Sequence, residues 1–102
     1  MTRAVHKYYL RIKDGIQSVP MPRDARIVHV DKQDEFICMW AEVDLADGNH
    51  NREFEVFGTG HPIKDASMVW RGTVLGTGHR GTVLDGFFVW HVYESGIWPN
   101  VR

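Results

Sequence analysis

The chain has 102 residues, of which 43% are hydrophobic and 12% aromatic, enough for one domain with a single modest core. Twelve Lys and Arg residues nearly balance thirteen Asp and Glu residues, so the strong positive charge of a dedicated nucleic-acid binder is missing and we expect no nucleic-acid partner. No segment approaches the roughly 20 apolar residues of a membrane span, the first residues lack the apolar stretch of a signal peptide, and one cysteine cannot form an internal disulfide. These features predict one cytoplasmic domain over residues 1–102 without a membrane contact, with residues 95–102 as a C-terminal tail.

The first segment with a clear pattern is residues 5–13, where apolar and charged side chains alternate as in a half-buried strand. An Asp-Gly pair that ends at Gly15 predicts a tight turn, with residues 16–19 as the return arm of a β-hairpin. Pro20 and Pro22 cannot donate hydrogen bonds to a neighbouring strand. We therefore expect the chain to leave the sheet at these prolines.

The middle of the chain predicts three more strands. Residues 26–31 alternate, with Val28 and Val30 on one face. Residues 36–43 are apolar on both faces for most of their length, which is typical of a central strand covered on each side. Residues 52–57 resume the alternation, with apolar side chains inward and glutamates outward.

The last third predicts two further strands at residues 68–75 and 87–93, the second apolar on both faces. A near-repeat of Gly-Thr-Val-Leu in residues 72–80 and 81–89 suggests short β-segments joined by tight turns. Residues 62–67 allow at most one helical turn. About seven mainly antiparallel strands with little or no helix predict an all-β domain, either a small β-sandwich or a partly open barrel.

The tetrapeptide Gly-Thr-Gly-His occurs twice, starting at Gly58 and at Gly76. Glycines around a threonine can turn backbone N–H groups toward an anion, and the histidine can ligate a metal or move a proton. Phosphate loops usually gain strength from a helix N-terminus, which this sequence does not predict. Turn formation is therefore the interpretation we favour, with the first copy ending a strand and the second forming a hairpin tip.

Histidine is frequent in this chain, and His50, His61 and His79 all fall in predicted loops that could converge on a zinc ion. No two of the candidate ligands have a spacing typical of zinc sites. We therefore favour solvated loop histidines and predict no metal and no cofactor. His29 and His91 fall in predicted strands, where a buried, hydrogen-bonding histidine is the favoured interpretation.

No residue carries a catalytic signature. Cys38 lies in the predicted central strand, where a structural role is favoured over a nucleophilic one. Glu53 and Glu55 share the outward face of one strand, as a solvated pair does. Three of the four tryptophans fall in predicted strands and are expected in the core, whereas Trp98 lies in the tail, where it docks on its own domain or on a partner.

Several segments carry a family resemblance: residues 21–30, 38–44, 57–63, 72–74 and 89–94. Through them the chain resembles, over nearly its whole length, a family of small uncharacterised proteins encoded by phages of actinobacteria, of the mycobacteriophage type. The resemblance implies no established activity. It retains His61 and His91 as site candidates but not His79, because the second tetrapeptide lies in a segment that is shorter in typical members.

Together, the resemblance and the missing catalytic signatures predict a non-enzymatic phage accessory protein that binds a host or phage protein in the bacterial cytoplasm. One alternative is a small-ligand protein that binds or sequesters a phosphorylated nucleotide through the Gly-Thr-Gly amides. Another is a metal-dependent hydrolase. A homodimer is compatible with all three. The candidate binding residues are Gly58, Thr59, Gly60, His61, Arg80, His91 and Trp98.

Overall fold

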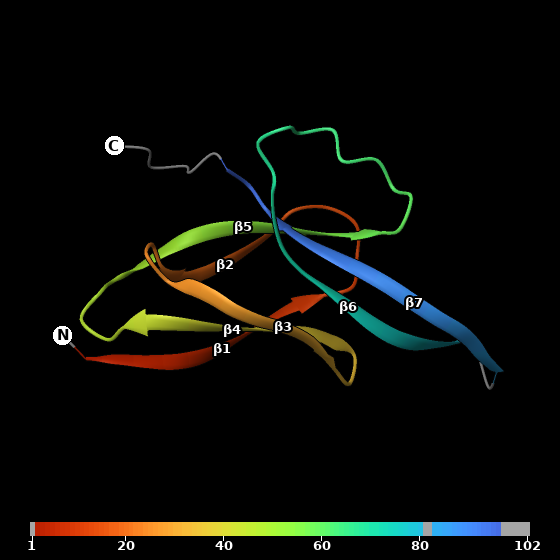
Figure 1. Ribbon diagram of the computed structural model, residues 1–102, viewed down its shortest axis with the longest axis horizontal. Helices are drawn as coiled ribbons and strands as arrows, with labels where there is room; N and C mark the ends of the chain where they lie inside the picture. The colour runs from red at the N-terminus through yellow and green to blue at the C-terminus, as the bar shows by residue number, and fades with distance from the viewer. Residues whose placement is uncertain (1, 81–82, 97–102) are drawn as a thin grey trace.

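The computed structural model describes residues 2–80 and 83–96, with side chains described outside residues 77–87 (Figure 1). Seven strands and no helix occur in this part of the chain, so none of its segments is a helix that could cross a membrane. The prediction of a small all-β domain of about seven strands is confirmed. The strands are β1 (Arg3–Arg11), β2 (Gln17–Pro22), β3 (Arg26–Gln33), β4 (Phe36–Asp44), β5 (Asn49–Gly58), β6 (Val69–Arg80) and β7 (Val83–Glu94).

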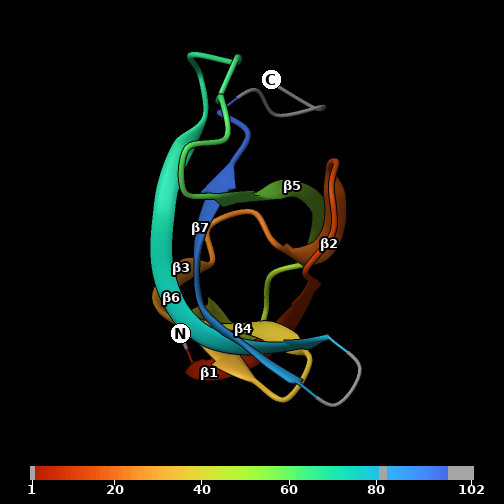
Figure 2. The same cartoon turned by 90° about the vertical axis from the view of Figure 1, so that its right-hand side faces the viewer.

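The strands form two antiparallel sheets, a three-stranded sheet in the order β1-β4-β3 and a four-stranded sheet in the order β2-β5-β7-β6. Figure 2 shows β4 and β5 on opposite sides of the interior, with β6 curving along one flank. β3 and β6 lie close together where the two sheets meet. The core fills the space between the sheets and includes Leu10, Met21, Val30, Ile37, Met39, Ala41, Val43, Phe54, Val56, Val74 and Val92.

The predicted hairpin at the start of the chain is wrong, because β1 pairs with β4 and β2 pairs with β5. The turn between them is real, and Gly15 has a φ of 94°, a conformation that favours glycine. Gln17 links the two sheets at this turn. Its side chain accepts from the backbone N–H of Arg11 at 2.8 Å and donates to the carbonyl of Arg11 at 2.7 Å.

The prediction that the chain leaves the sheet at the two prolines is also wrong. Pro20 and Pro22 lie within β2 and pair with residues of β5. β2 is an edge strand, and an edge is where a sheet tolerates residues that cannot donate a backbone hydrogen bond. The chain crosses to the other sheet just afterwards, through a turn in which the N–H of Ala25 donates to the carbonyl of Pro22 at 3.1 Å.

An irregularity in β3 corrects the predicted inward face of that strand. The register shifts between Ile27 and His29, so Ile27 packs partly against the core and Val28 is 47% exposed. Val30 is buried as predicted. The central position predicted for residues 36–43 is confirmed, since β4 lies between β1 and β3 and Cys38 is fully buried.

β6 and β7 form one long hairpin that pairs as far as Arg80 and Val83. The second Gly-Thr-Gly-His therefore lies within β6, and the prediction of a hairpin tip at Gly76 is wrong. The physical reason is a close approach of β3 to β6. A Cβ atom on Gly76 would lie 2.5 Å from the Cδ atom of Lys32, so the glycine makes room for this β3 side chain.

An ion-pair network that the sequence patterns did not predict lies inside the domain. Arg52 of β5 donates to both carboxylate oxygens of Glu94 of β7, at 2.6 and 2.8 Å, and the two side chains are only 3% and 2% exposed. Arg71 donates to the same carboxylate at 2.9 Å, and Arg52 also donates to the carbonyl of Ala25 at 2.6 Å. Burial raises the pKa of the Tyr8 phenol, and the nearby Arg52 charge opposes part of this shift. The network ties β5, β7 and the β2–β3 turn together.

Candidate functional site

The first Gly-Thr-Gly-His ends β5 in a compact turn, as predicted. The N–H of His61 donates to the carbonyl of Gly58 at 3.1 Å, and the N–H of Gly58 donates to Nδ1 of His61 at 3.3 Å. Gly60 has a φ of 90°, which glycine adopts without strain. The backbone N–H groups of Gly58 and His61 are therefore engaged within the turn.

His91 of β7 brings this turn into contact with the outward face of the four-stranded sheet. Its Nε2 atom lies 2.9 Å from Oγ1 of Thr59, and its Nδ1 atom lies 3.0 Å from Oγ1 of Thr73. The indole N–H of Trp70 donates to Oγ1 of Thr73 at 2.9 Å. Two predicted site residues, Thr59 and His91, thus meet in one hydrogen-bond chain that runs from Trp70 to the turn.

The hydrogen-bond chain from Trp70 to Thr59 serves to position side chains. A neutral imidazole has one donor and one acceptor nitrogen, and threonine hydroxyls can fill either role. Among the described contacts of His91 there is no carboxylate to hold it as a general base. The two threonines therefore fix the orientation of the His91 ring, and Thr73 fixes the indole of Trp70.

Apolar side chains surround His91 on the same outward face. Trp70 is 56% and Leu75 62% exposed, and both belong to β6, the edge strand. The rings of Phe57 and Tyr93 contact each other edge to face, with centroids 5.7 Å apart. We call this surface the Trp70 face, and it comprises Trp70, Thr73, Leu75, Val89, His91 and Tyr93, with the buried ring of Phe57 beside them.

The structure corrects the prediction that the strand tryptophans are core residues. Trp90 packs against the core, but Trp40 is half-buried on the outward face of the other sheet, and Trp70 is exposed. The reason for Trp70 is a register shift between Trp70 and Gly72, which places Trp70 on the same face as Thr73. A regular strand would have turned Trp70 inward with Val74.

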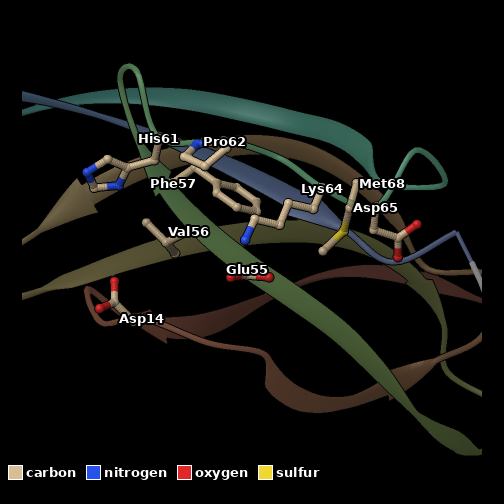
Figure 3. Close-up of a pocket in the computed structure, with 9 residues that line it drawn as sticks. All are labelled: Asp14, Glu55, Val56, Phe57, His61, Pro62, Lys64, Asp65 and Met68. Atoms are coloured by element: carbon tan, nitrogen blue, oxygen red, sulfur yellow. The ribbon is translucent and has the colours of Figure 1, made fainter.

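A pocket of about 590 Å³ lies beside the same turn, where β5 continues beyond its pairing with β2 (Figure 3). Figure 3 shows His61 and Pro62 above the strand, Glu55 and Val56 on it, and Asp14 on the opposite side. His91 is not among the residues that line this pocket, so this pocket does not bring His61 and His91 together. The pocket is lined by Asp14, Glu55, Val56, Phe57, His61, Pro62, Lys64, Asp65 and Met68.

Asp65 in this pocket has an ordered environment. The N–H and the hydroxyl of Ser67 donate to Oδ1 of Asp65 at 2.9 and 2.7 Å, and these bonds lower the pKa of the carboxyl.

Replacing Ser67→Ala removes the hydroxyl bond, so we expect the pKa of Asp65 to rise toward its ordinary value. Carboxyl ¹³C chemical shifts followed against pH measure it. Ser18→Ala, an exposed serine in β2, is the matched control and should leave the Asp65 titration unchanged.

A family model described as a domain of unknown function (DUF7352) matches residues 1–98. The chain belongs to this family. No curated protein and no solved structure matches it. The sequence resemblance likewise implied a family without an established activity. The matched residues include both the first Gly-Thr-Gly-His and the strand that carries His91.

Two of the remaining predicted site residues, Arg80 and Trp98, fall partly or wholly outside the described part of the chain. Arg80 lies at the end of β6 opposite Val83, and its side chain and Trp98 lie outside the described residues. His50 lies in β5 rather than in a loop, with its Nδ1 atom 3.3 Å from Nη2 of Arg23. The side chain of His29 is 63% exposed and 3.7 Å from Asp31, so the prediction of a buried histidine there is wrong.

The zinc interpretation of the loop histidines finds no support in the described geometry. His79, like His50, lies in a strand rather than in a loop. Within residues 2–80 and 83–96, no group of three or more His, Cys, Asp or Glu side chains is placed to hold a metal ion. The described residues therefore offer no metal-centred chemistry on which to build a site.

Proposed function

We propose that this protein is a non-enzymatic accessory protein, encoded by a phage, that binds a host or phage protein in the bacterial cytoplasm through the Trp70 face. The phage origin and the compartment rest on the sequence resemblance. The observation that carries the binding surface is the exposed indole of Trp70, which a hydrogen bond to Thr73 holds in place on an open sheet face.

The composition of the face favours a protein partner. Contiguous exposed apolar surface on a small domain marks interaction sites, and tryptophan and tyrosine supply much of the binding energy in protein interfaces. The indole of Trp70 loses less conformational freedom on binding because Thr73 already orients it. Leu75 and Val89 extend the apolar surface on either side of the β6–β7 pairing, and the His91 ring, which Thr59 and Thr73 hold in place, lies beside them.

The two alternative functions find less support at the neighbouring turn. The N–H groups of Gly58 and His61 have partners within the turn, which leaves them poorly placed to bind a phosphate. The adjacent pocket is lined by three carboxylates, those of Asp14, Glu55 and Asp65, against one lysine, Lys64, so its charge disfavours a phosphate. A metal-dependent hydrolase needs a ligand cluster, and none exists among the described side chains.

Trp70→Ala is expected to weaken partner binding about 30-fold, the loss typical of an interface hot spot of about 2 kcal/mol. The partner is first captured by cross-linking in a lysate of the natural host and then purified for calorimetric titration. Leu45→Ala removes a comparably exposed side chain from a loop distant in sequence from the face and is the control, expected to bind within twofold of wild type.

Two outcomes would contradict the proposal. One is a purified partner that binds Trp70→Ala as tightly as it binds the wild type, while Trp70→Ala and Leu45→Ala both keep the wild-type melting temperature. The other is a wild-type protein that is a dimer in light scattering and becomes monomeric on Trp70→Ala, because the occupant of the face would then be a second copy of the chain.

A further inference from the structure

The outward face of the three-stranded sheet has a chemistry different from that of the Trp70 face. Strand pairing sets Lys7 beside Trp40 and Arg11 beside Phe36, and Tyr9 lies between the two cations on the edge strand β1. Tyr9 is 55% exposed. We call this surface the cation–aromatic face, and it comprises Arg3, Lys7, Tyr9, Arg11, Phe36 and Trp40.

Rings and cations are in direct contact across this face. Nζ of Lys7 lies 5.3 Å from the ring centroid of Tyr9 and 5.7 Å from that of Trp40. The guanidinium carbon of Arg11 lies 6.0 Å from the ring centroid of Phe36. Lys7 also donates to Oε1 of Gln33 at 2.7 Å, across β4, and this bond helps to cover Cys38. The cations therefore lie close to the exposed ring of Tyr9 and to the half-buried rings of Trp40 and Phe36.

Positive charge is concentrated on the β1 side of the face, whereas β3 carries the exposed carboxylate of Asp31 in line with Cys38 and Tyr9. Residues 2–13 contain four Lys and Arg residues and no Asp or Glu, although the whole chain has a formal net charge of −1. Glu42, at the far end of the face, forms ion pairs with Arg3 at 3.0 Å and with Arg26 at 3.5 Å. Cations also protect an edge strand from unwanted pairing, but that role does not require exposed rings beside them.

A hollow of about 540 Å³ marks the end of the face that carries Lys7 and Arg11. Tyr9 and Phe36 meet edge to face at its rim, with centroids 5.7 Å apart. Asp34 is the carboxylate among its lining residues, and its charge is opposed by the two cations. The hollow is lined by Lys7, Tyr9, Arg11, Gln17, Gln33, Asp34 and Phe36.

We propose that the cation–aromatic face binds single-stranded nucleic acid, with bases stacking on Tyr9 and Phe36 and phosphates contacting Lys7 and Arg11. Sequence-tolerant single-strand binders combine these two elements, a cationic track and aromatic platforms. Side chains that share one face of a strand recur about every 6.7 Å, so Lys7, Tyr9 and Arg11 follow one another along β1 at that spacing. A duplex is the poorer fit because its bases are already stacked, and an acidic peptide is the poorer fit because carboxylates do not use the rings.

Fluorescence anisotropy with a labelled oligo-dT of about 12 nucleotides tests the proposal on the full chain at low salt. We expect saturable binding, with a logarithm of the association constant that falls linearly with the logarithm of salt concentration at a slope of about −1.4, as for the two phosphate contacts of Lys7 and Arg11. Lys7→Glu should weaken binding at least tenfold, and Tyr9→Ala at least about fivefold. Lys64→Glu is the matched control on the loop after β5 and should stay within twofold.

Four results would overturn the proposal: no saturable binding, an equal loss with Lys64→Glu, no effect of Tyr9→Ala, or equal competition by an oligoglutamate of the same length. Competition by thymidine monophosphate at the same nucleotide concentration would also overturn it, because the hollow would then be a mononucleotide site. Trp70→Ala should bind the oligonucleotide as wild type does, which separates failure here from failure of the Trp70 face.

Discussion

Glu94→Ala is expected to lower the free energy of unfolding by about 3–5 kcal/mol, the largest effect we expect of any single substitution in this domain. Glu94 is 2% exposed and accepts hydrogen bonds from Arg52 and Arg71. Its removal takes away the carboxylate that accepts two hydrogen bonds from the guanidinium of Arg52, a group that is only 3% exposed and therefore costly to leave without this opposite charge. Urea unfolding followed by tryptophan fluorescence and circular dichroism measures the change.

The control for this prediction is Glu55→Ala, which removes a half-buried glutamate from the outward side of β5 and should cost at most about 0.5 kcal/mol. The double variant Arg52→Ala, Glu94→Ala should cost clearly less than the sum of the single variants, because each partner is costly to leave alone. Equal unfolding midpoints for Glu94→Ala and Glu55→Ala would show that the buried pair does not stabilise the domain. If Glu94→Ala fails to fold, Glu94→Gln gives the same comparison with a smaller loss.

Gly72→Ala is expected to destabilise the domain by about 1–3 kcal/mol, the cost of overpacking a close contact. Gly72 is buried where β6 meets β3, and a Cβ atom there would lie 2.7 Å from both Cβ and Cγ2 of Val30. Gly72 and Val30 are both held by strand pairing within their sheets, so the clash is relieved only if β3 and β6 move apart. The shift of the urea unfolding midpoint measures the loss, provided that the m value, the dependence of the free energy of unfolding on urea concentration, is unchanged.

Gly48→Ala is the matched control, because an added Cβ at Gly48 meets no atom within 4 Å. We expect this loop variant to unfold at the wild-type urea concentration or slightly above it. A Gly72→Ala protein as stable as Gly48→Ala would mean that β3 and β6 can separate at little cost, and Gly76 would then tolerate a larger side chain as well.

The sequence predicted individual strands better than their partners. The central strand at residues 36–43 was predicted correctly because a short run that is apolar on both faces is typical of a strand covered on each side. The first hairpin was wrong because a turn at Gly15 specifies a reversal but not which strand lies alongside. The alternation of apolar and polar residues could not predict the register shifts either. The shift next to Ile27 turned Val28 outward and brought Ile27 toward the core, and the shift next to Trp70 turned Trp70 outward.

The candidate site was predicted in part. The first Gly-Thr-Gly-His and the strand with His91 are about thirty residues apart, yet Thr59 and His91 are in contact. Trp70 was missed as a surface residue because its exposure depends on a register shift. A signal for the buried pair did exist, since Arg52 shares its strand face with Phe54 and Glu94 shares its face with Val92, which puts opposite charges on the core side of adjacent strands.

Net charge describes the whole chain and not one surface. The formal charge of −1 includes residues 2–13, which contain no Asp or Glu, so the expectation of no nucleic-acid partner, which rested on that sum, stays a prediction that the oligonucleotide titration tests. The two sheets carry outward surfaces of different character, one apolar around Trp70 and one cationic and aromatic around Tyr9. The proposals assign a different class of partner to each.

The most direct test of the Trp70 face places a photo-cross-linking amino acid at Leu75, which is 62% exposed on β6, and compares it with the same residue at Leu45, which is 53% exposed on a loop. Irradiation is carried out in cells of the natural host, and adducts are resolved by mass. We expect one dominant protein adduct from position 75 that is absent at position 45 and is lost when Trp70→Ala is added. Equal adduct patterns from the two positions, or no adduct from position 75, would contradict a partner-binding role for this face.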